Sequence, residues 1–186
     1  MTDETRPFIV GIGGTVRENS GTEQALRVAL AAAEQQGAGA KAFGGADLMR
    51  QPIYDPQDEA SRDARIEFVE AVRAADGLII ASPGYHGSIS GLVKNALDGL
   101  EDLRADARPY LDGRAVGAIV LSDGAQAGGS TLAALRAIIH ALRGWPTPLG
   151  AVLLAGAEAG ADDVRLALVA EQVVMFARGQ ACGARR

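Results

Sequence analysis

The sequence predicts one doubly wound α/β domain, in which helices cover both faces of a parallel sheet. Short apolar segments rich in β-branched residues alternate five times with longer segments of helical periodicity. The segment 76–82, DGLIIAS, is nearly continuously apolar, as expected of a strand that is covered on both sides. Because no internal repeat or linker interrupts the alternation, we expect residues 1–186 to form a single domain.

In chain order, the first half predicts a strand at 7–14, a helix at 21–36, a weak strand at 40–45, a long loop at 46–63, a helix at 64–75 and a strand at 76–82. Ser20 and Glu23 have the spacing of a capping box at the start of the first helix. The helix at 64–75 is expected to turn Ile66, Val69 and Val72 toward the core.

The second half predicts a helix at 88–100, a strand at 114–122, a helix at 130–144, a strand at 149–156 and a helix at 161–179. We expect Ser88 to be the N-cap of the helix at 88–100. Pro146 and Pro148 are expected to break the chain before the last strand. Residues 179–186 are expected to be a flexible tail.

Composition restricts the function. The chain is 48% hydrophobic and 22% charged with a net charge of −5, which gives no indication of a nucleic-acid or anionic membrane surface. The N-terminus lacks the apolar region of a signal peptide, and no apolar run reaches the ~20 residues that span a bilayer. We therefore expect a cytoplasmic protein. The single cysteine, Cys182, and two histidines predict neither a disulfide nor a metal site.

Three of the strand-to-helix loops contain more Gly, Ser and polar residues than a connector needs, namely 13–22, 82–88 and 122–130. In a sheet of order 2-1-3-4-5, the first, third and fourth strands are neighbours, so these loops would meet at one edge. Doubly wound sheets bind ligands at this edge, beyond the carboxyl ends of the strands. The sequence therefore predicts one binding crevice formed by the three loops.

The first loop has the chemistry of a phosphate site. Thr15, Asn19, Ser20 and Thr22 offer donor groups, Arg17 offers positive charge, and the following helix begins with free N–H groups. The loop is neither a Walker loop nor a dinucleotide fingerprint, because the required lysine and third glycine are absent. An ordinary capped helix with a solvated Arg17 remains the alternative.

The second loop places Tyr85 between Gly84 and Gly87, where it could stack on a planar ring while the backbone approaches the ring's edge. The alternative is a plain turn with a half-buried tyrosine. The letters GSISG match a nucleophile elbow, but residues 82–85 already occupy the strand-to-helix turn. We identify no catalytic side chain.

The segment SPGYHGSISGLVKNALD, at 82–98, resembles a motif of the NAD(P)H-dependent FMN reductase family, T-P-E-Y-N-G-S-x-P-G-x-L-K-N-A-x-D. GGTVRENSGT resembles the family's first loop, G-S-x-R-x-x-S-x-[NT], and SDGAQAGG its third flavin loop. The resemblance implies a flavodoxin-like three-layer sandwich, with a five-stranded parallel sheet of order 2-1-3-4-5. Gly84 and His86 depart from the motif, where they replace Glu and Asn.

The resemblance also implies that FMN is bound and that NADPH or NADH donates a hydride to it. The FMN-binding residues would be Thr15, Arg17, Asn19, Ser20, Gly21, Thr22, Pro83, Gly84, Tyr85, His86, Gly87, Ser88, Ser122, Asp123 and Gly124. Electrons would pass to a small-molecule acceptor, or reduced FMN would be supplied to a flavin-dependent monooxygenase.

Two alternatives stay open. One is a quinone, azo-dye or metal-ion reductase with tightly bound FMN, and the other is a non-enzymatic flavodoxin-type electron carrier. By resemblance to the family we also expect a homodimer or homotetramer, with contacts from residues 47–58 and from the helix at 88–100.

Overall fold

A parallel sheet forms the centre of the protein. The structure, a computed structural model, describes residues 6–158 and 160–183. Five parallel strands lie in the order β2-β1-β3-β5-β6, so the predicted fold class and strand order are confirmed. A sixth, two-residue strand, β4, pairs antiparallel with the end of β3. The strands are β1 (Phe8–Gly13), β2 (Gly39–Phe43), β3 (Gly77–Tyr85), β4 (Ser88–Ile89), β5 (Ala115–Ser122) and β6 (Trp145–Leu154).

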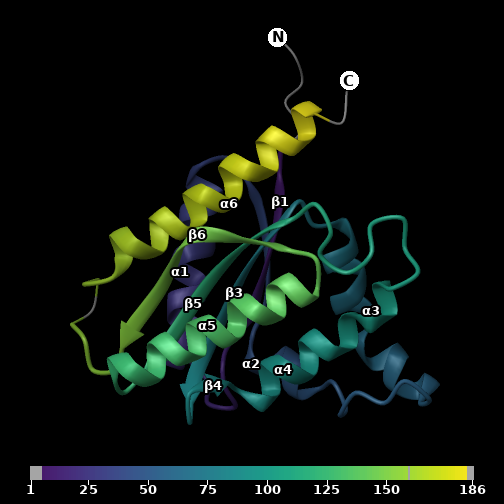
Figure 1. The fold of residues 1–186 in the computed structure, drawn as a ribbon, viewed down its shortest axis with the longest axis horizontal. Helices are drawn as coiled ribbons and strands as arrows, with labels where there is room; N and C mark the ends of the chain where they lie inside the picture. The colour runs from purple at the N-terminus through teal and green to yellow at the C-terminus, as the bar shows by residue number, and fades with distance from the viewer. Residues whose placement is uncertain (1–5, 159, 184–186) are drawn as a thin grey trace.

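Helices cover both faces of the sheet (Figure 1). On one face lie α1 (Gly21–Gln35) and α6 (Asp163–Gly183), and on the other lie α3 (Glu59–Ala74), α4 (Gly91–Asp98), the 3₁₀ helix η1 (Gly99–Leu103) and α5 (Ala125–Ala141). Successive strand residues point to opposite faces, so Val10 and Ile12 enter one core cluster while Ile9 enters the other.

The N-cap of α4 is Ser90, and the prediction of Ser88 was wrong. Ser88 lies in β4 and pairs with Tyr85, so its backbone belongs to a hairpin. Ser90 accepts a hydrogen bond from the Val93 N–H at 3.2 Å, and the helix begins at Gly91. The hairpin uses the residues that periodicity had assigned to the first helical turn.

The predicted loop at 46–63 was also too long. A short helix, α2 (Gly45–Met49), opens the segment, and α3 begins at Glu59. Ile66 was predicted to face the core but is 55% exposed, and Phe68 occupies the buried position with Val69 and Val72. The inward stripe of α3 is therefore displaced relative to the one that the sequence suggested.

Two further boundaries differ in the second half. Helix α5 begins at Ala125, five residues before the predicted start, because it continues through Gly128 and Gly129. Strand β6 includes Pro146 and Pro148, which an edge strand tolerates because its outer N–H groups need no partner. Helix α6 continues to Gly183, so the residues from 179 to 183 of the expected tail are helical. Residues 184–186 lie outside the described part of the chain.

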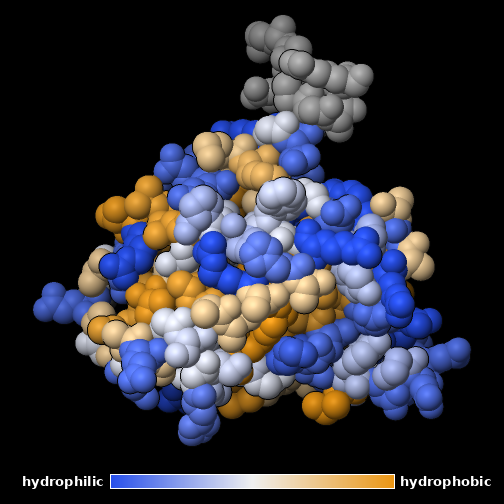
Figure 2. Space-filling view, viewed as in Figure 1, coloured by the Kyte–Doolittle hydropathy of each residue, from blue (hydrophilic) through white to orange (hydrophobic). Residues whose placement is uncertain are grey.

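The open edge of β6 is covered by side chains. The Arg136 Nη1 donates to the Thr147 carbonyl at 2.8 Å, and the Gln172 Oε1 accepts from the Leu149 N–H at 2.9 Å. Figure 2 shows hydrophobic and hydrophilic residues interspersed on this side of the molecule. The large apolar side chains that β6, α6 and their connection expose are Trp145, Leu154, Val164, Leu168 and Met175. No helix in the described ranges is long and apolar enough to cross a membrane.

Candidate functional site

The three loops singled out in the sequence meet at the carboxyl edge of β1, β3 and β5. A Cβ added at Gly13 would lie 2.2 Å from the Ala81 carbonyl oxygen, so the ends of β1 and β3 are in direct contact. A Cβ at Gly84 would lie 3.1 Å from the Ser122 Cβ, which brings β3 against the end of β5. A Cβ added at Gly21, at the start of α1, would lie 2.8 Å from the Leu121 Cδ2 of β5. The predicted convergence is therefore present.

In the first loop, several predicted ligands are engaged within the loop itself. The Thr15 Oγ1 accepts from the Arg17 N–H at 3.1 Å, and the Ser20 Oγ accepts from the Glu23 N–H at 3.3 Å, so Ser20 caps α1 as predicted. Asn19 has a positive φ of 52°, and its Oδ1 accepts from the Arg27 Nη2 at 3.0 Å. These three side chains shape the loop.

Two groups of the first loop keep unused hydrogen-bonding capacity. The exposed Arg17 guanidinium has no partner within the described ranges. The Thr22 Oγ1 is fully buried in the first turn of α1 and lacks a hydrogen-bond partner among the described residues. The first N–H groups of α1 also have no intrahelical acceptor. The loop therefore combines a free cation, an unpaired hydroxyl and a helix N-terminus, of which Gly21 is the first residue.

The second loop is a β-hairpin that extends beyond the sheet. Pro83 is buried in β3, while Tyr85 at the end of that strand is 51% exposed. His86 and Gly87 have φ values of 52° and 82° and connect Tyr85 to its partner Ser88. Two successive positive φ angles are typical of a type I′ turn. The hairpin presents the exposed Tyr85 and His86 at the carboxyl end of β3.

The third loop is short, because α5 begins directly after Gly124. Ser122 is buried at the end of β5, and its Oγ donates to the Gly124 carbonyl at 2.9 Å. Asp123 is exposed, and Gly124 is the N-cap of α5 in extended conformation. The predicted loop at 122–130 is thus mostly the first turn and a half of a helix, whose N-terminus faces the same edge of the sheet.

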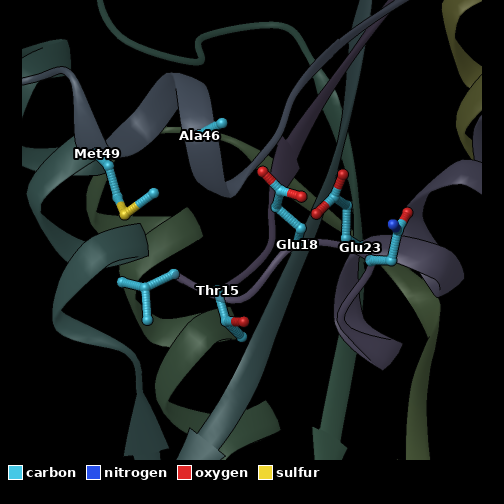
Figure 3. Close-up of a pocket in the computed structure, with 7 residues that line it drawn as sticks. Thr15, Glu18, Glu23, Ala46 and Met49 are labelled. Atoms are coloured by element: carbon cyan, nitrogen blue, oxygen red, sulfur yellow. The ribbon is translucent and has the colours of Figure 1, made fainter.

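A pocket of about 350 Å³ lies between the first loop, the first turn of α1 and the short helix α2. Figure 3 shows Glu18 and Glu23 on one side of it, with Ala46 and Met49 on the α2 side. Glu23 also pairs with Arg27 at 3.5 Å. Two carboxylates in its lining make this pocket unsuited to a phosphate group.

Sequence reasoning missed the residues that fix the second loop. The Ser82 hydroxyl accepts from the Ser90 N–H at 3.0 Å, and the Thr131 Oγ1 donates to the Ser88 carbonyl at 3.3 Å. These contacts join residues that are 8 and 43 positions apart in the chain, so no local pattern reveals them. Ser90, which precedes a glycine and an apolar run, was a sequence signal for the N-cap of α4, but Ser88 was an equally acceptable N-cap residue.

The pKa shifts lie away from the three loops. Burial raises the pKa of Tyr54, and the nearby carboxylates of Glu101 and Asp102 raise it further. Burial lowers the pKa of Arg114 to about 10, although its guanidinium donates to three backbone carbonyls. Both groups support the fold near α3: the Tyr54 ring packs against Arg65, and Arg114 donates to the carbonyls of Arg73 and Ala75 at the end of that helix.

A family model of NADPH-dependent FMN reductases matches residues 7–159, a range that includes the sheet and all three loops. The chain belongs to this family. The motif resemblance that the sequence suggested is therefore confirmed.

Curated proteins with similar sequences bear the name FMN-dependent NADPH-azoreductase. One from Staphylococcus haemolyticus is 37% identical over 82 residues, which cover 44% of this chain and 40% of that protein. One from Staphylococcus aureus is 35% identical over 91 residues, covering 49% and 44%. The aligned region thus spans less than half of the length of either relative.

Solved structures share the fold of this FMN reductase family member. An oxidoreductase from Corynebacterium diphtheriae superimposes with a TM-score of 0.68 at 21% identity, covering 92% of this chain and 96% of that one. The apo form of an NADH:FMN oxidoreductase gives 0.68 at 22% identity, covering 93% and 89%. A WrbA-like flavodoxin from Agrobacterium tumefaciens gives 0.67 at 18% identity, covering 93% and 98%. The flavodoxin-like fold is thereby confirmed.

Proposed function

We propose that this protein is an NAD(P)H-dependent FMN reductase that binds FMN across the carboxyl ends of β1, β3 and β5. The observation that carries the proposal is the convergence of three polar loops at one edge of the sheet, in a chain of this family. Ligands bind at this position in doubly wound sheets, where strand order reverses.

The phosphate end of FMN fits the first loop. A phosphate dianion at the N-terminus of α1 would accept from its free N–H groups, and Arg17 would neutralise its charge. The unpaired Thr22 Oγ1 would gain a partner there after a small adjustment of its buried side chain. Glu18, and Glu23 in the first turn of α1, line the neighbouring pocket, so the dianion would lie away from their carboxylates and toward Arg17 and the N–H groups of α1.

The ring end of FMN fits the hairpin and the start of α5. Tyr85 offers an aromatic face, and the backbone from Gly84 to Gly87 offers donors and acceptors to a polar ring edge. Gly84 leaves little room for a side chain, because a Cβ there would lie 3.0 Å from the Thr131 Oγ1. When bound, FMN supplies the chemistry, since its ring accepts a hydride from a nicotinamide and passes electrons on. The protein's part is to bind and orient the ring, without a side-chain general base.

We also propose azo compounds as electron acceptors, because a specific observation favours them. The similar curated proteins are named as azoreductases, and both matches are partial. A half-exposed Tyr85 at an open rim would leave the ring accessible to a flat aromatic acceptor. Quinones, metal ions and a monooxygenase that takes reduced FMN are the other acceptors to be compared.

The test is an FMN titration of the purified protein, followed by NADPH and NADH oxidation under nitrogen. We expect saturable binding with a shifted flavin spectrum, and multiple turnovers of NAD(P)H when an acceptor is added. Ping-pong kinetics with retained flavin would favour an azo or quinone reductase. Free FMN acting as a saturable substrate would favour supply to a monooxygenase.

Two results would contradict the proposal. Absence of FMN binding by calorimetry would remove its basis. Binding without NAD(P)H oxidation would instead identify a flavodoxin-type electron carrier.

We further propose a cytoplasmic homodimer or homotetramer, for which the exposed Ile53 in the segment 47–58 supplies a candidate contact.

A further inference from the structure

The hairpin that presents Tyr85 has little sheet structure of its own. Strand β4 has two residues, and its two residue pairs are Gly84–Ile89 and Tyr85–Ser88. A hairpin of this size is marginally stable unless other contacts hold it. Something besides the ladder must therefore fix the position of Tyr85.

Ser82 closes the base of this hairpin. It is fully buried, and its Oγ accepts from the Ser90 N–H at 3.0 Å while donating to the Pro83 carbonyl at 2.9 Å. One hydroxyl thus joins β3, three residues before the end of that strand, to the N-cap residue of α4. Because the side chain is fully buried and its hydrogen is donated to the Pro83 carbonyl, the hydroxyl is available neither as a nucleophile nor as a ligand.

The connection continues into α4. Ser90 is 4% exposed, and its own hydroxyl caps the helix by accepting from the Val93 N–H at 3.2 Å. Elsewhere the hairpin is held at its flank, where Thr131 of α5 donates to the Ser88 carbonyl, and beneath, where Ile89 enters the core. Of these contacts, the one made by Ser82 joins the strand before the hairpin directly to the residue that follows it.

We propose that Ser82 is a positioning residue, which holds the hairpin so that Tyr85 and the neighbouring backbone can bind the flavin ring. This inference rests on the proposed function, since it concerns the ring end of the same site. Loss of the hydroxyl leaves the buried Ser90 N–H without an acceptor and frees the hairpin base, a defect that costs more than the bond itself contributes. The phosphate end is held by the first loop and is unaffected.

The first arm of the test needs no flavin. Hydrogen exchange of the ligand-free protein is compared among wild type, Ser82→Ala and Ser82→Thr. We expect exchange in residues 84–93 to accelerate about tenfold in Ser82→Ala and to return to the wild-type rate in Ser82→Thr, which restores the hydroxyl. Ser61→Ala is the matched control, because Ser61 is 3% exposed, bonds to Asp58 and lies on α3.

The second arm separates ring from phosphate. Riboflavin carries the same ring as FMN but no phosphate, so a defect in ring binding weakens both ligands equally. We expect Ser82→Ala to lose about tenfold in affinity for each, with altered visible circular dichroism of the bound flavin. Arg17→Ala is expected to weaken FMN alone, which makes the two patterns distinguishable.

Several results would overturn the inference. Unchanged exchange in residues 84–93 of Ser82→Ala would show that the hydroxyl does not hold the hairpin. Faster exchange with unchanged affinity for both flavins would show that holding the hairpin does not position the flavin ring. A wild type that binds neither flavin would refute the proposed function itself. Should Ser82→Ala fail to fold, Ser82→Cys, whose thiol is a weaker hydrogen-bond partner at the same position, is expected to give a smaller but equal loss for both flavins, and an unequal loss would refute the inference.

Discussion

Gly45 lies directly against the main chain of Thr15. A Cβ added at Gly45 would come within 1.8 Å of the Thr15 carbonyl oxygen, and a Cβ at Gly14 would lie 2.6 Å from the Gly45 nitrogen. The start of α2 is therefore pressed against the loop that follows β1, and no side chain fits between them. The path of the proposed phosphate loop depends on this contact.

Gly45→Ala should therefore destabilise the protein by about 3 kcal/mol and weaken FMN binding, because backbone must move to admit the methyl group. Gly91→Ala is the control, since a Cβ there meets nothing within 4 Å and Gly91 has no positive φ. That control should be neutral or slightly stabilising. Urea denaturation and an FMN titration measure both effects. Equal stability of the two variants would contradict the close contact.

Arg17 should contribute to FMN binding through its charge. Arg17→Ala is expected to weaken FMN at least tenfold while leaving riboflavin unchanged, and the effect should shrink as salt is raised. Arg104→Ala serves as the control, because Arg104 is an exposed arginine that pairs with Glu101 on η1. Isothermal titration at two salt concentrations provides the measurement. A loss that is equal for both flavins would place Arg17 away from the phosphate.

His86 occupies a turn position that favours asparagine. Its φ of 52° is left-handed, a conformation that asparagine adopts at lower cost. His86→Asn should raise the free energy of unfolding by about 0.5–1 kcal/mol. His140→Asn, at an exposed position in α5, should change stability by less than about 0.5 kcal/mol. Thermal melts of the two variants would decide, and turnover of His86→Asn tests whether the histidine tunes the reaction.

Alkaline pH should reduce stability partly through Tyr54. Burial, together with Glu101 and Asp102, raises the pKa of this phenol above its ordinary value of about 10. The unfolded chain then loses its proton first, so the free energy of unfolding falls as pH rises from about 10 toward the folded pKa. Tyr54→Phe should show a shallower decline between pH 9 and about 11 in denaturant titrations. An identical slope in both proteins would show that the folded environment does not hold the proton.

The segment around Ile53 should carry an oligomer contact. Ile53 is 81% exposed, yet Asn95 fixes the backbone on either side of it, accepting from the Tyr54 N–H at 2.8 Å and donating to the Pro52 carbonyl at 2.9 Å. Ile53→Glu should weaken assembly in sedimentation velocity, whereas Ile66→Glu, which changes an exposed residue on α3, should not. A monomeric wild type would refute the expected homo-oligomer.

The parallel sheet with helices on both faces followed from the alternation of elements, whereas the strand order, and with it the meeting of the three loops, rested on the resemblance to a flavodoxin-like family. The ends of helices and strands were harder to predict from the sequence where contacts between distant residues determine them. Gly128 lies inside α5, although glycine disfavours helices, because a Cβ there would lie 2.4 Å from the Val152 Cγ1 of β6. The choice of Ser90 over Ser88 depends on the turn at His86 and Gly87, which local periodicity does not show.

The residues predicted to bind FMN in the first loop fall into two groups, a division that composition could not reveal. Thr15, Asn19 and Ser20 were selected as donors, but their side chains are bonded within the loop and its helix. Arg17 and the Thr22 hydroxyl keep their hydrogen-bonding capacity free. A sequence gives the types of polar groups, whereas the folded loop determines which of them still need a partner.

The bonds from Arg136 and Gln172 to the outer strand β6 also bear on how copies of the protein can meet. A strand arriving from a neighbouring molecule would find main-chain sites already taken by guanidinium and amide groups, and prolines where it needs donors. Continuous sheets across two molecules, and the fibrous aggregates that grow from them, are therefore disfavoured at this border. At this border, self-association would then proceed through side-chain packing, which point substitutions can tune without disturbing the sheet.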